Sequence, residues 1–442
     1  MHSSKQTSRH LSPPIVIAGS FLLLIIIGTL LLKLPVATTQ PITWTDALFT
    51  ATSATTVTGL SVFDIGTTLT LFGQIVMLFL IQFGGIGLMT FAVAVLIMFG
   101  RKVGMQHRIY IQESFNEQSI GGMVKLVKRI LLFVVIAEGV AIVLLSVYWA
   151  ADFGWVKGIY YSIFHVISAF NNAGFALFPD NLIQFAGDPV VLFTLSSLFI
   201  VGGIGFVVVT DIFTKKSFRK WSLHTKLMIS GTLLINAVAT LVLFILEYHN
   251  PHTIGDFSWA KKLLVSYFQA VSPRTAGFNA VSMGEMEDSS LLFTMFLMFI
   301  GGGSASTASG IKLTTFIVVI FATMHYVRGI PEPHLFGRSI KIDVLIRSLA
   351  ITTLSIFVVM GSLFLLTITE NLSLLALAVE VFSAFGTVGL SVGITAELSN
   401  VGKVLLCIVM FIGRIGPLTL FFLLLKKRRE SYHLPYDQVH TG

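Results

Sequence analysis

Four segments of the chain share a serine that is followed, five or six residues later, by a glycine. The pairs are Ser53 with Gly59, Ser168 with Gly174, Ser272 with Gly277, and Ser383 with Gly389. The glycines recur at intervals close to a quarter of the 442 residues. Glycine lets an extended strand turn its carbonyl oxygens to one side without a clash of Cβ atoms, and rings of carbonyl oxygens can replace the hydration shell of an alkali cation. The pattern therefore indicates a shared binding site for a small cation.

The candidate residues of this site surround the four glycines. They are Thr56, Val57, Thr58 and Gly59 in the first segment, Asn171, Asn172, Ala173 and Gly174 in the second, Arg274, Thr275, Ala276 and Gly277 in the third, and Gly386, Thr387, Val388 and Gly389 in the fourth. We expect potassium at the carbonyl oxygens of Thr58, Gly59, Ala173, Gly174, Ala276, Gly277, Val388 and Gly389. The side chains directly before the glycines are neutral, which suits a weakly hydrated monovalent cation, whereas a divalent channel more often carries a ring of carboxylates.

A second, glycine-rich mark follows each of these segments. It reads Gly84-Gly85-Ile-Gly87, Gly202-Gly203-Ile-Gly205, Gly301-Gly302-Gly303 and Gly413-Arg414-Ile-Gly416. Two marks that recur four times in one order indicate an internal repeat. The alternative, that glycine-rich helices merely pack closely, explains the second mark but not the first.

The elements that position these segments are expected to be membrane helices. Charged residues make up 11% of the chain and hydrophobic residues 55%, which excludes an ordinary soluble domain. We expect the first span of each quarter at 15–32, 126–147, 227–246 and 344–367, each long enough to cross a hydrocarbon layer of roughly 30 Å. The short segments before each filter glycine hold only about 12–14 helical residues and are predicted to be re-entrant half-helices.

The sequence thus predicts an all-α polytopic membrane protein, with four helix–pore-loop–helix repeats around a central pore, like a potassium channel. The predicted repeats are 1–100, 101–220, 221–328 and 329–442. Irregular backbone is tolerated at membrane depth only where protein buries it or where it lines a water-filled path. The pore helices would also direct their negative ends toward the ion.

The basic residues behind the net charge of +8 are distributed as the predicted topology requires. Lysine and arginine gather at 101–129, 215–226, 328–347 and 426–429, with Lys5 and Arg9 near the N-terminus. The positive-inside rule puts these segments, and so both termini, in the cytoplasm of a multi-pass protein of the cell membrane. This placement favours a role in topology over nucleic-acid binding. The single cysteine, Cys407, excludes an intrachain disulfide.

Residues 301–310 interrupt the second span of the third quarter and are a candidate gate, since broken helices in membranes usually line a transport path. The candidate gate residues are Gly301, Gly302, Gly303, Ser304, Ala305, Ser306, Thr307, Ala308, Ser309, Gly310, Lys312 and Arg414. Arg414 is expected either to form a positive constriction below the filter or to hold helices in a structural ion pair. The partner of Lys312 stays open between the surroundings of Arg414 and an acidic group.

The motifs resemble those of a known family. The segments are Ala54-Thr-Thr-Val-Thr-Gly59-Leu, Asn171-Asn-Ala-Gly-Phe175, Arg274-Thr-Ala-Gly-Phe-Asn279 and the run from Gly301 to Lys312. They resemble those of the Trk/Ktr/HKT superfamily of potassium transporters over essentially the whole chain, and the length is most similar to its KtrB-type membrane subunits. Ser309 departs from the glycine that the resemblance leads us to expect.

The resemblance implies potassium uptake by the ion-translocating subunit of a Ktr-type system, with dependence on sodium. It also implies a homodimer with one pore per protomer and a cytoplasmic ring of KtrA- or KtrC-type nucleotide-binding regulatory subunits. In plant relatives a serine at the first filter position goes with sodium transport, so Gly59 favours potassium. The transported potassium, with sodium, is the expected cofactor.

Several alternatives remain at this point. A carrier for another monovalent cation, such as ammonium or sodium, fits the same composition. An intramembrane serine protease around Ser304 would need a histidine base, and His165 is the only histidine well inside an apolar segment. We expect His165 to be a satisfied buried residue and the protein not to be an enzyme. Glu380, in the fourth pore helix, either favours cations from behind the filter or makes a structural hydrogen bond, and Glu138 is a second acidic residue in a span. No Walker loop or dinucleotide fingerprint is present, so we expect no organic cofactor.

Overall fold

The computed structural model describes residues 13–87, 123–304, 306–330 and 332–419. Lys5, Arg9, the basic residues between 101 and 122, the basic run 426–429 and the candidate gate residue Ala305 lie outside the described residues. So does the predicted boundary at residue 100. The boundaries at 220 and 328 remain predictions. Within the described residues the chain is mostly helical, and its strands are the two-residue β1 (His334–Leu335) and β2 (Arg338–Ser339), which pair antiparallel.

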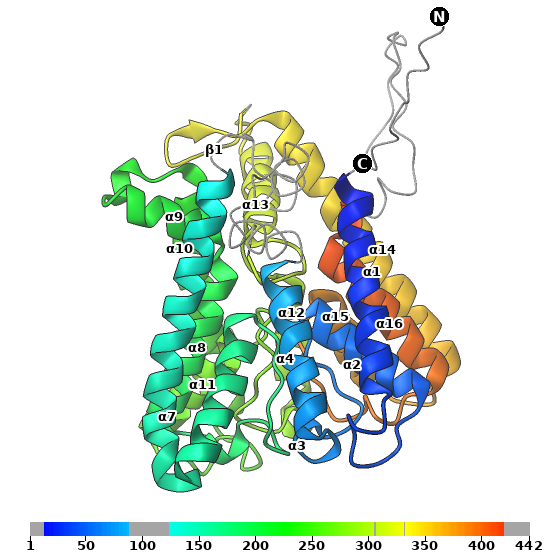
Figure 1. Ribbon diagram of the computed structural model, residues 1–442. Helices are drawn as coiled ribbons and strands as arrows, with labels where there is room; N and C mark the ends of the chain where they lie inside the picture. The colour runs from blue at the N-terminus through cyan, green and yellow to red at the C-terminus, as the bar shows by residue number, and fades with distance from the viewer. Residues whose placement is uncertain (1–12, 88–122, 305, 331, 420–442) are drawn as a thin grey trace, which may run out of the picture.

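Among the described residues, four helices are each long and apolar enough to cross a membrane (Figure 1). They are α1 (Pro13–Leu32), α7 (Met123–Phe170), α10 (Leu223–Glu247) and α14 (Ile342–Thr369). These helices contain the four predicted first spans, so that prediction is confirmed. The backbone of α7 turns at Gly154, where φ is 76°, and its second part is a pore helix.

The other pore helices are separate and short. They are α2 (Trp44–Thr56), α11 (Trp259–Val271) and α15 (Leu374–Gly386). Thr43 and Ser373 cap α2 and α15, because each side chain accepts a hydrogen bond from the backbone N–H three residues later, a standard N-cap. The residues toward the C-terminal end of each of these helices are buried, so the pore helices end inside the protein.

The first helix of each second span ends at the glycine mark. They are α4 (Leu71–Ile86), α8 (Pro189–Ile204) with α9 (Phe206–Thr214), α12 (Asp288–Phe299) with α13 (Leu313–Val327), and α16 (Asn400–Ile415). From the sequence, only the break between α12 and α13 is expected. In addition, α8 and α9 meet at 91°. The last glycine of the mark has nearly the same backbone angles in the other three quarters, with φ of 88° at Gly87, 108° at Gly205 and 92° at Gly416.

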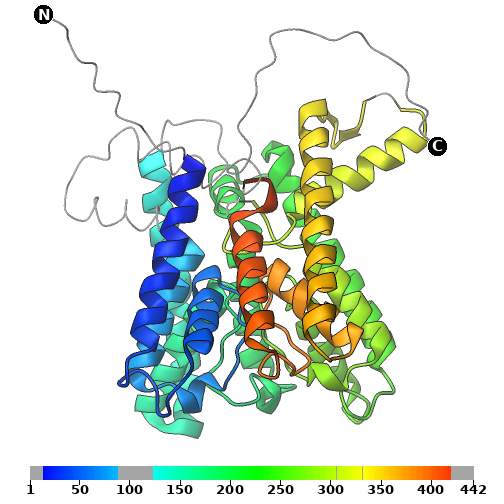
Figure 2. The same ribbon diagram turned by 90° about the vertical axis from the view of Figure 1, so that its right-hand side faces the viewer.

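Short helical turns complete the chain: α3 (Ile65–Thr68), η1 (Ile183–Phe185), η2 (Phe218–Lys220) and η3 (Met283–Glu285). The four repeats close into a ring, since α4 packs against α7, α8 against α11, α12 against α15, and α16 against α2. Figure 2 shows α16 beside the N-terminal helices. An ion pair between Lys403 Nζ on α16 and Asp46 Oδ1 on α2, 2.9 Å long, joins the last quarter to the first.

In three of the quarters, polar contacts tie the end of the first span to the start of the second span. In the third quarter, Glu247 at the end of α10 accepts a hydrogen bond from the N–H of Glu287, which precedes α12 (3.0 Å). In the fourth, Glu370 after α14 accepts one from the N–H of Ser399, which precedes α16 (3.0 Å). In the second, Tyr148 donates to Asp188 Oδ2, the residue that caps α8 (2.8 Å). Since the N-terminus of a helix favours an acceptor or a negative charge, these contacts fix the spacing of the spans.

Candidate ion-binding site and gate

Each pore helix ends in the same unusual backbone turn. The residue that follows its last turn has a positive φ although it is not glycine: 57° at Val57, 60° at Asn172, 74° at Thr275 and 47° at Thr387. For β-branched residues such as valine and threonine this conformation costs on the order of 1–3 kcal/mol. The turn reverses the chain, so that the following residues run back from the end of the pore helix as an irregular strand.

The serine of the first mark holds this turn in place. The N–H of Thr58 donates to the carbonyl of Ser53 (2.8 Å), and the N–H of Gly59 donates to its hydroxyl oxygen (3.1 Å). The fourth quarter repeats both bonds between Ser383 and the pair Val388 and Gly389, at 2.8 and 3.0 Å. In the third quarter, where the spacing is one residue shorter, the carbonyl of Ser272 still accepts from the N–H of Ala276 (2.9 Å), but its hydroxyl donates to the carbonyl of Phe278.

The four glycines lie together around one axis, in cyclic order. A Cβ atom added to any of these glycines would lie within 3 Å of a backbone carbonyl oxygen of another segment. The distances are 2.5 Å for Gly59 and Ala173, 2.9 Å for Gly174 and Ala276, 2.2 Å for Gly277 and Val388, and 2.3 Å for Gly389 and Thr58. Each glycine therefore faces the carbonyl that precedes the glycine of the next segment, and the fourth returns to the first. A side chain has no room at any of these positions.

The carbonyl groups of this ring belong to the residues predicted to hold the cation. Thr58, Ala173, Ala276 and Val388 have fully buried side chains that carry no charge. Within the ring, the available polar groups are thus backbone carbonyls. Such a set of ligands suits an alkali cation, whose hydration shell it can replace.

The side chains of the other candidate filter residues point to protein partners. Thr56 and Thr58 share a hydrogen bond of 2.7 Å between their hydroxyl groups. Asn171 donates to Gln82 Oε1 on α4 (2.7 Å), and Asn172 donates to Thr275 Oγ1 of the next segment (3.1 Å). These side chains brace the strands from behind.

Two of the predicted filter residues stand apart from the ring. The side chain of Arg274 leaves the axis and donates from Nη1 to Asn236 Oδ1 on α10 (3.1 Å). Gly386 is the last residue of α15, and a Cβ there would lie 2.5 Å from the carbonyl of Met298 on α12. Gly386 therefore lets the pore helix approach α12.

The described residues between Gly301 and Gly310 form a loop that lies against the second filter segment. Its ends meet, because the N–H of Gly301 donates to the carbonyl of Ile311 (2.8 Å). The N–H of Gly303 donates to the carbonyl of Gly203 in the second glycine mark (2.7 Å). The loop therefore returns on itself and is anchored to the break between α8 and α9.

Thr307 connects this loop to the second filter segment. Its hydroxyl donates to Asn172 Oδ1 (2.9 Å) and lies 3.3 Å from the carbonyl of Phe170. Asn172 in turn donates to Thr275. A continuous series of hydrogen bonds thus runs from the loop to two of the four filter strands.

Arg414 holds the other side of the loop. Its guanidinium donates to the carbonyl of Thr307 and to Ser309 Oγ (3.1 Å), and also to the carbonyls of Gly84 and Gly85 at the end of α4 (3.1 Å to Gly85). Among the described residues no carboxylate lies within ion-pair distance of it. The predicted alternative of a structural ion pair is therefore wrong for this part of the chain, because carbonyl and hydroxyl acceptors satisfy the cation instead.

Lys312 and Ser309 also find partners inside the loop. Lys312 Nζ donates to the carbonyl of Ala308 (2.7 Å), so of the two options left open, the surroundings of Arg414 are the correct one. Ser309, which departs from the expected glycine, accepts a hydrogen bond from Arg414. The hydroxyl adds a contact that glycine lacks.

The second glycine mark has a packing role that sequence reasoning underestimated. A Cβ at Gly84 would lie 2.0 Å from the carbonyl of Thr55, one at Gly202 would lie 2.1 Å from that of Phe170, and one at Gly413 would lie 2.1 Å from that of Phe385. All three carbonyls are at the ends of pore helices of the same quarter. The mark therefore combines close packing under a pore helix with the break of the second span.

The acidic and histidine candidates are satisfied by hydrogen bonds. Glu380 is buried and accepts from the hydroxyls of Ser391 and of Thr395 (3.0 Å) in the loop after the fourth filter segment. His165 lies with Nδ1 2.7 Å from the carbonyl of Tyr161 and accepts at Nε2 from the N–H of Leu177 (3.2 Å). Both residues therefore have the hydrogen bonds that their structural interpretation predicts, and an influence of Glu380 on cations stays a prediction.

Gln82 was not singled out by sequence. It receives the hydrogen bond from Asn171 and donates to Glu138 Oε1 on α7 (3.3 Å), so that α4 and α7 both support the second filter segment. The only sequence signal for it is a polar residue two positions before the first glycine mark.

The chain was compared with known proteins. The family described as "Cation transport protein", TrkH, matches residues 2–432. The chain belongs to this family. A relative from Bacillus subtilis (strain 168), the Ktr system potassium uptake protein B, is 52% identical over 98% of this chain and 97% of its own length. The protein of the same name from Vibrio alginolyticus is 42% identical over 97% of this chain and 95% of its own length.

Two further similarities bear on the family. The Potassium/sodium uptake protein NtpJ of Enterococcus hirae is 35% identical over 99% of both chains. The crystal structure of the potassium transporter TrkH from Vibrio parahaemolyticus superposes with a TM-score of 0.74, covering 96% of this chain and 87% of that one, at 18% identity. The fold is therefore that of the TrkH family, a polytopic membrane protein with four helix–pore-loop–helix repeats.

Proposed function

We propose that this chain is the ion-translocating subunit of a potassium uptake system and conducts potassium through the ring of the four glycine segments. The observation that carries this proposal is the cyclic contact of Gly59, Gly174, Gly277 and Gly389 with the carbonyls of the neighbouring segments. A ring of neutral carbonyl ligands favours a monovalent cation. The names of the relatives from Bacillus and Vibrio support potassium.

The proposed ligands of potassium are the carbonyls of the glycine and of the residue before it in each segment. The pore helices add to the attraction, because the negative ends of their dipoles meet the ring at Val57, Asn172, Thr275 and Thr387. On this proposal the chain carries an ion and is not an enzyme. It sits in the cell membrane with both termini in the cytoplasm, which agrees with the rule for basic loops.

The loop 301–310 is proposed as the gate. Arg414 and Thr307 keep it under the ring by hydrogen bonds to Gly84, Gly85 and Asn172. A loop of glycine, serine and threonine satisfies its own backbone groups and can take a second arrangement at low cost. Opening would require these bonds to exchange, and the guanidinium to withdraw from the path of the cation.

The partners proposed for this chain are a second copy of itself and a cytoplasmic ring of nucleotide-binding subunits of the KtrA or KtrC type. The support is the word "system" in the names of the relatives together with the high identity to them. Dependence on sodium is proposed by analogy, with the name of the Enterococcus relative, which pairs potassium with sodium, as its support.

The experiment that tests the proposed function is ion uptake by the purified chain in liposomes. Uptake of potassium, rubidium, sodium and ammonium is measured with and without external sodium, and with and without the regulatory ring. We expect potassium and rubidium to compete with each other and to exceed sodium and ammonium. Uptake that favours sodium or ammonium would replace the proposal with a carrier for that ion.

A further inference from the structure

A small cavity lies beside the third filter segment, away from the ring of glycines. Its walls come from α8, α10, the end of α11 with the segment after it, and the gate loop, and include Gly203, Thr232, Arg274 and Gly302. The volume in this cavity that is open to the centre of a water molecule is about 20 Å³. One bound water molecule requires about 10–15 Å³ of such volume. The cavity therefore has room for one small species.

Two polar groups at this cavity have no hydrogen-bond partner among the described residues. They are Nε of Arg274 and the hydroxyl of Thr232, whose side chains are 8% and 5% exposed. Nη1 of Arg274 donates to Asn236, whereas Nε has no acceptor among the described residues. Buried donors in folded proteins are almost always paired, so two unpaired groups on one cavity indicate a missing acceptor.

The charge of Arg274 also lacks a counter-charge. The ion pairs of the described chain are Lys215 with Asp211, His252 with Glu285 and Lys403 with Asp46. The guanidinium of Arg414 has four acceptors in place of an anion, whereas that of Arg274 has only Asn236 among the described residues. A buried cation with neither a paired anion nor a full set of acceptors is strongly disfavoured. Arg274 also stands three residues before Gly277 in the sequence. Without a counter-charge, its positive charge opposes a cation in the ring.

The two observations together select the ligand. A cation is excluded by the guanidinium. A water molecule would accept the hydrogen bonds but would leave the charge of Arg274 without a counter-charge. A monovalent anion accepts from both donors and also neutralises the charge, and the space excludes phosphate esters or nucleotides.

We propose that this cavity binds one inorganic anion of the size of chloride, between Nε of Arg274 and the hydroxyl of Thr232. The ion is structural and does not enter the conduction path. It joins the third filter segment to α8, α10 and the gate loop at Gly302, so it stabilises these four parts against one another.

The first experiment looks for the ion directly. The purified chain is crystallised with bromide in place of chloride, and anomalous scattering is measured at the bromine edge. We expect one peak in the cavity, within hydrogen-bond distance of Arg274 Nε. Density of a water molecule without an anomalous peak there would overturn the proposal.

The second experiment measures affinity. The melting temperature of the purified chain is followed while gluconate is replaced by chloride at constant potassium and ionic strength. Thr232→Val removes one donor at nearly constant volume and should raise the half-saturating chloride concentration about tenfold, since a hydrogen bond to a charged group is worth at least that factor. Thr232→Ser keeps the donor and should behave as the parent does.

The matched control is Thr240→Val on the same helix, because the hydroxyl of Thr240 donates to the carbonyl of Asn236 within α10 (2.7 Å). It should leave the chloride dependence unchanged. Equal melting temperatures of the parent in gluconate and in chloride would refute the anion. So would the same chloride dependence in Thr232→Val as in the parent. Neither experiment measures potassium flux, so the anion site and the proposed function can fail separately.

Discussion

At the scale of single residues, the filter glycines are fixed by space as well as by backbone angle. Gly59, Gly277 and Gly389 have φ of 98°, 75° and 95° and face carbonyls at less than 3 Å from an added Cβ. Gly393 has a similar φ of 100° but nothing within 4 Å of an added Cβ. A side chain at Gly393 would therefore strain the backbone without displacing a carbonyl group, whereas a side chain at a filter glycine would do both.

We expect Gly59→Ser, Gly174→Ser, Gly277→Ser and Gly389→Ser each to lower the preference for potassium over sodium roughly tenfold, which corresponds to about 1.4 kcal/mol. The reason is that the new Cβ must push a carbonyl of the neighbouring segment. The measurement is competitive uptake of potassium and sodium in liposomes. Gly393→Ser, the control, should keep the preference of the parent. Unchanged selectivity in all four filter variants would remove these glycines from the filter.

Arg414 combines a charge with a set of hydrogen bonds, and two substitutions separate them. Arg414→Ala removes both, and we expect flux to rise about tenfold, equivalent to about 1.4 kcal/mol of barrier, because a cation close to a guanidinium is repelled by roughly 4 kcal/mol at an effective dielectric near 20. Arg414→Lys keeps the charge and should keep flux low. The readout is rubidium uptake per folded protein.

The same Arg414→Ala variant should also lose stability by about 1–3 kcal/mol, because the carbonyls of Thr307, Gly84 and Gly85 lose their donor. A folded alanine variant with lower stability and unchanged or lower flux would mean that Arg414 only holds the loop.

At the scale of elements, the gate loop depends on contacts with other quarters. We expect deletion of residues 304–309 to give a folded protein with high flux that no longer responds to the nucleotide of the regulatory ring, because the bonds of Thr307 to Asn172 and of Arg414 to the loop are lost. Thr307→Val, which removes only the hydroxyl, should weaken the response in part. The measurement is uptake with the proposed ring, in the presence and in the absence of its nucleotide. A folded deletion variant whose flux still follows the nucleotide would place the gate elsewhere.

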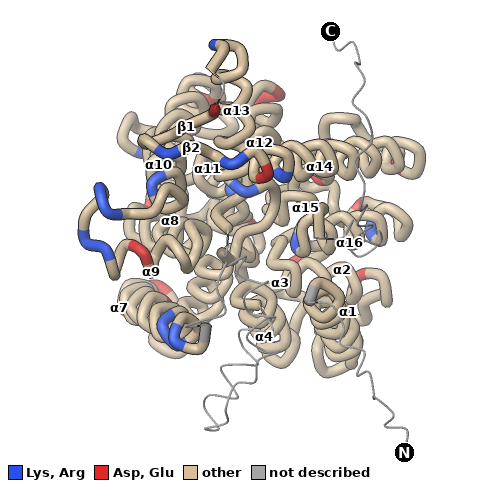
Figure 3. Tube along the Cα trace, turned by 90° about the horizontal axis from the view of Figure 1, so that it is seen from above, with Lys and Arg blue, Asp and Glu red and all other residues tan. Residues whose placement is uncertain are grey.

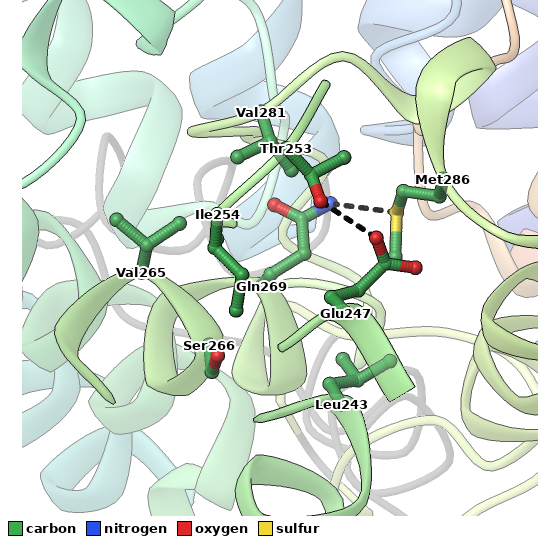
Figure 4. A pocket seen from close by; sticks show the side chains of 9 residues that line it. All are labelled: Leu243, Glu247, Thr253, Ile254, Val265, Ser266, Gln269, Val281 and Met286. Carbon is green, nitrogen blue, oxygen red and sulfur yellow. Dashed lines mark hydrogen bonds between the residues drawn. The ribbon is translucent and has the colours of Figure 1, made fainter. Parts of the chain in front are cut away.

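Buried carboxylates hold the end of a first span to the start of the second span, and Glu247 is the clearest case. Figure 4 shows Glu247 and Thr253 facing each other at a small cavity near Met286. Glu247 accepts from the hydroxyl of Thr253 (2.6 Å), from Asn250 Nδ2 (2.8 Å) and from the N–H of Glu287 (3.0 Å). The side chain thus joins α10 to the start of α12.

We expect Glu247→Ala to lower the free energy of unfolding by about 2–4 kcal/mol, because it leaves buried donors without an acceptor that carried a charge. Glu285→Ala is the control, because Glu285 is exposed and lies 3.9 Å from His252 in an exposed pair that contributes little. Thermal unfolding of the two variants is the measurement. Equal melting temperatures of the two variants would show that the hydrogen bonds of the Glu247 carboxylate do not stabilise the protein.

At the scale of the whole molecule, two basic segments form one surface. The segment 215–220 after α9 and the hairpin of β1 and β2 lie at the same end of the protein (Figures 1 and 3). They touch through the rings of Phe218 and Phe336, whose centroids are 6.2 Å apart. The lysines and arginines on them are exposed, so we expect this end to bind the proposed regulatory ring.

We expect the combined substitutions Lys216→Gln, Arg219→Gln, Arg338→Gln and Lys341→Gln to loosen binding of the regulatory ring at least tenfold, while basal uptake stays measurable. Loss of four charges also weakens contact with anionic lipid by about 1 kcal/mol per charge. The control is Lys157→Gln with Lys261→Gln, near the outer ends of the helices. Ring binding is measured by pull-down in detergent, where the lipid term is absent. Unchanged binding would mean that these charges only set topology.

Much of the fold could be predicted from the sequence. Hydrophobic length fixed the four first spans to within a few residues of α1, the first part of α7, α10 and α14. The repeated serine and glycine located the ends of the pore helices, since both residues act on the backbone next to them. The candidate site was predicted less completely: the glycines and their carbonyls converge, but the side chain of Arg274 leaves the ring for α10.

What the sequence by itself determined are the properties that depend on neighbouring residues: membrane spans, the fourfold repeat, the neutral ligands and the broken helix of the third quarter. Only the tertiary structure decided the partners of Arg414, because its acceptors Thr307 and Gly84 are 107 and 330 residues away in the chain. It also decided the left-handed turns at Val57 and Thr387, which the local preferences of valine and threonine oppose. Such turns persist because packing under the second glycine mark and the hydrogen bonds of Ser53 and Ser383 outweigh their cost, and those contacts exist only once the ring has closed.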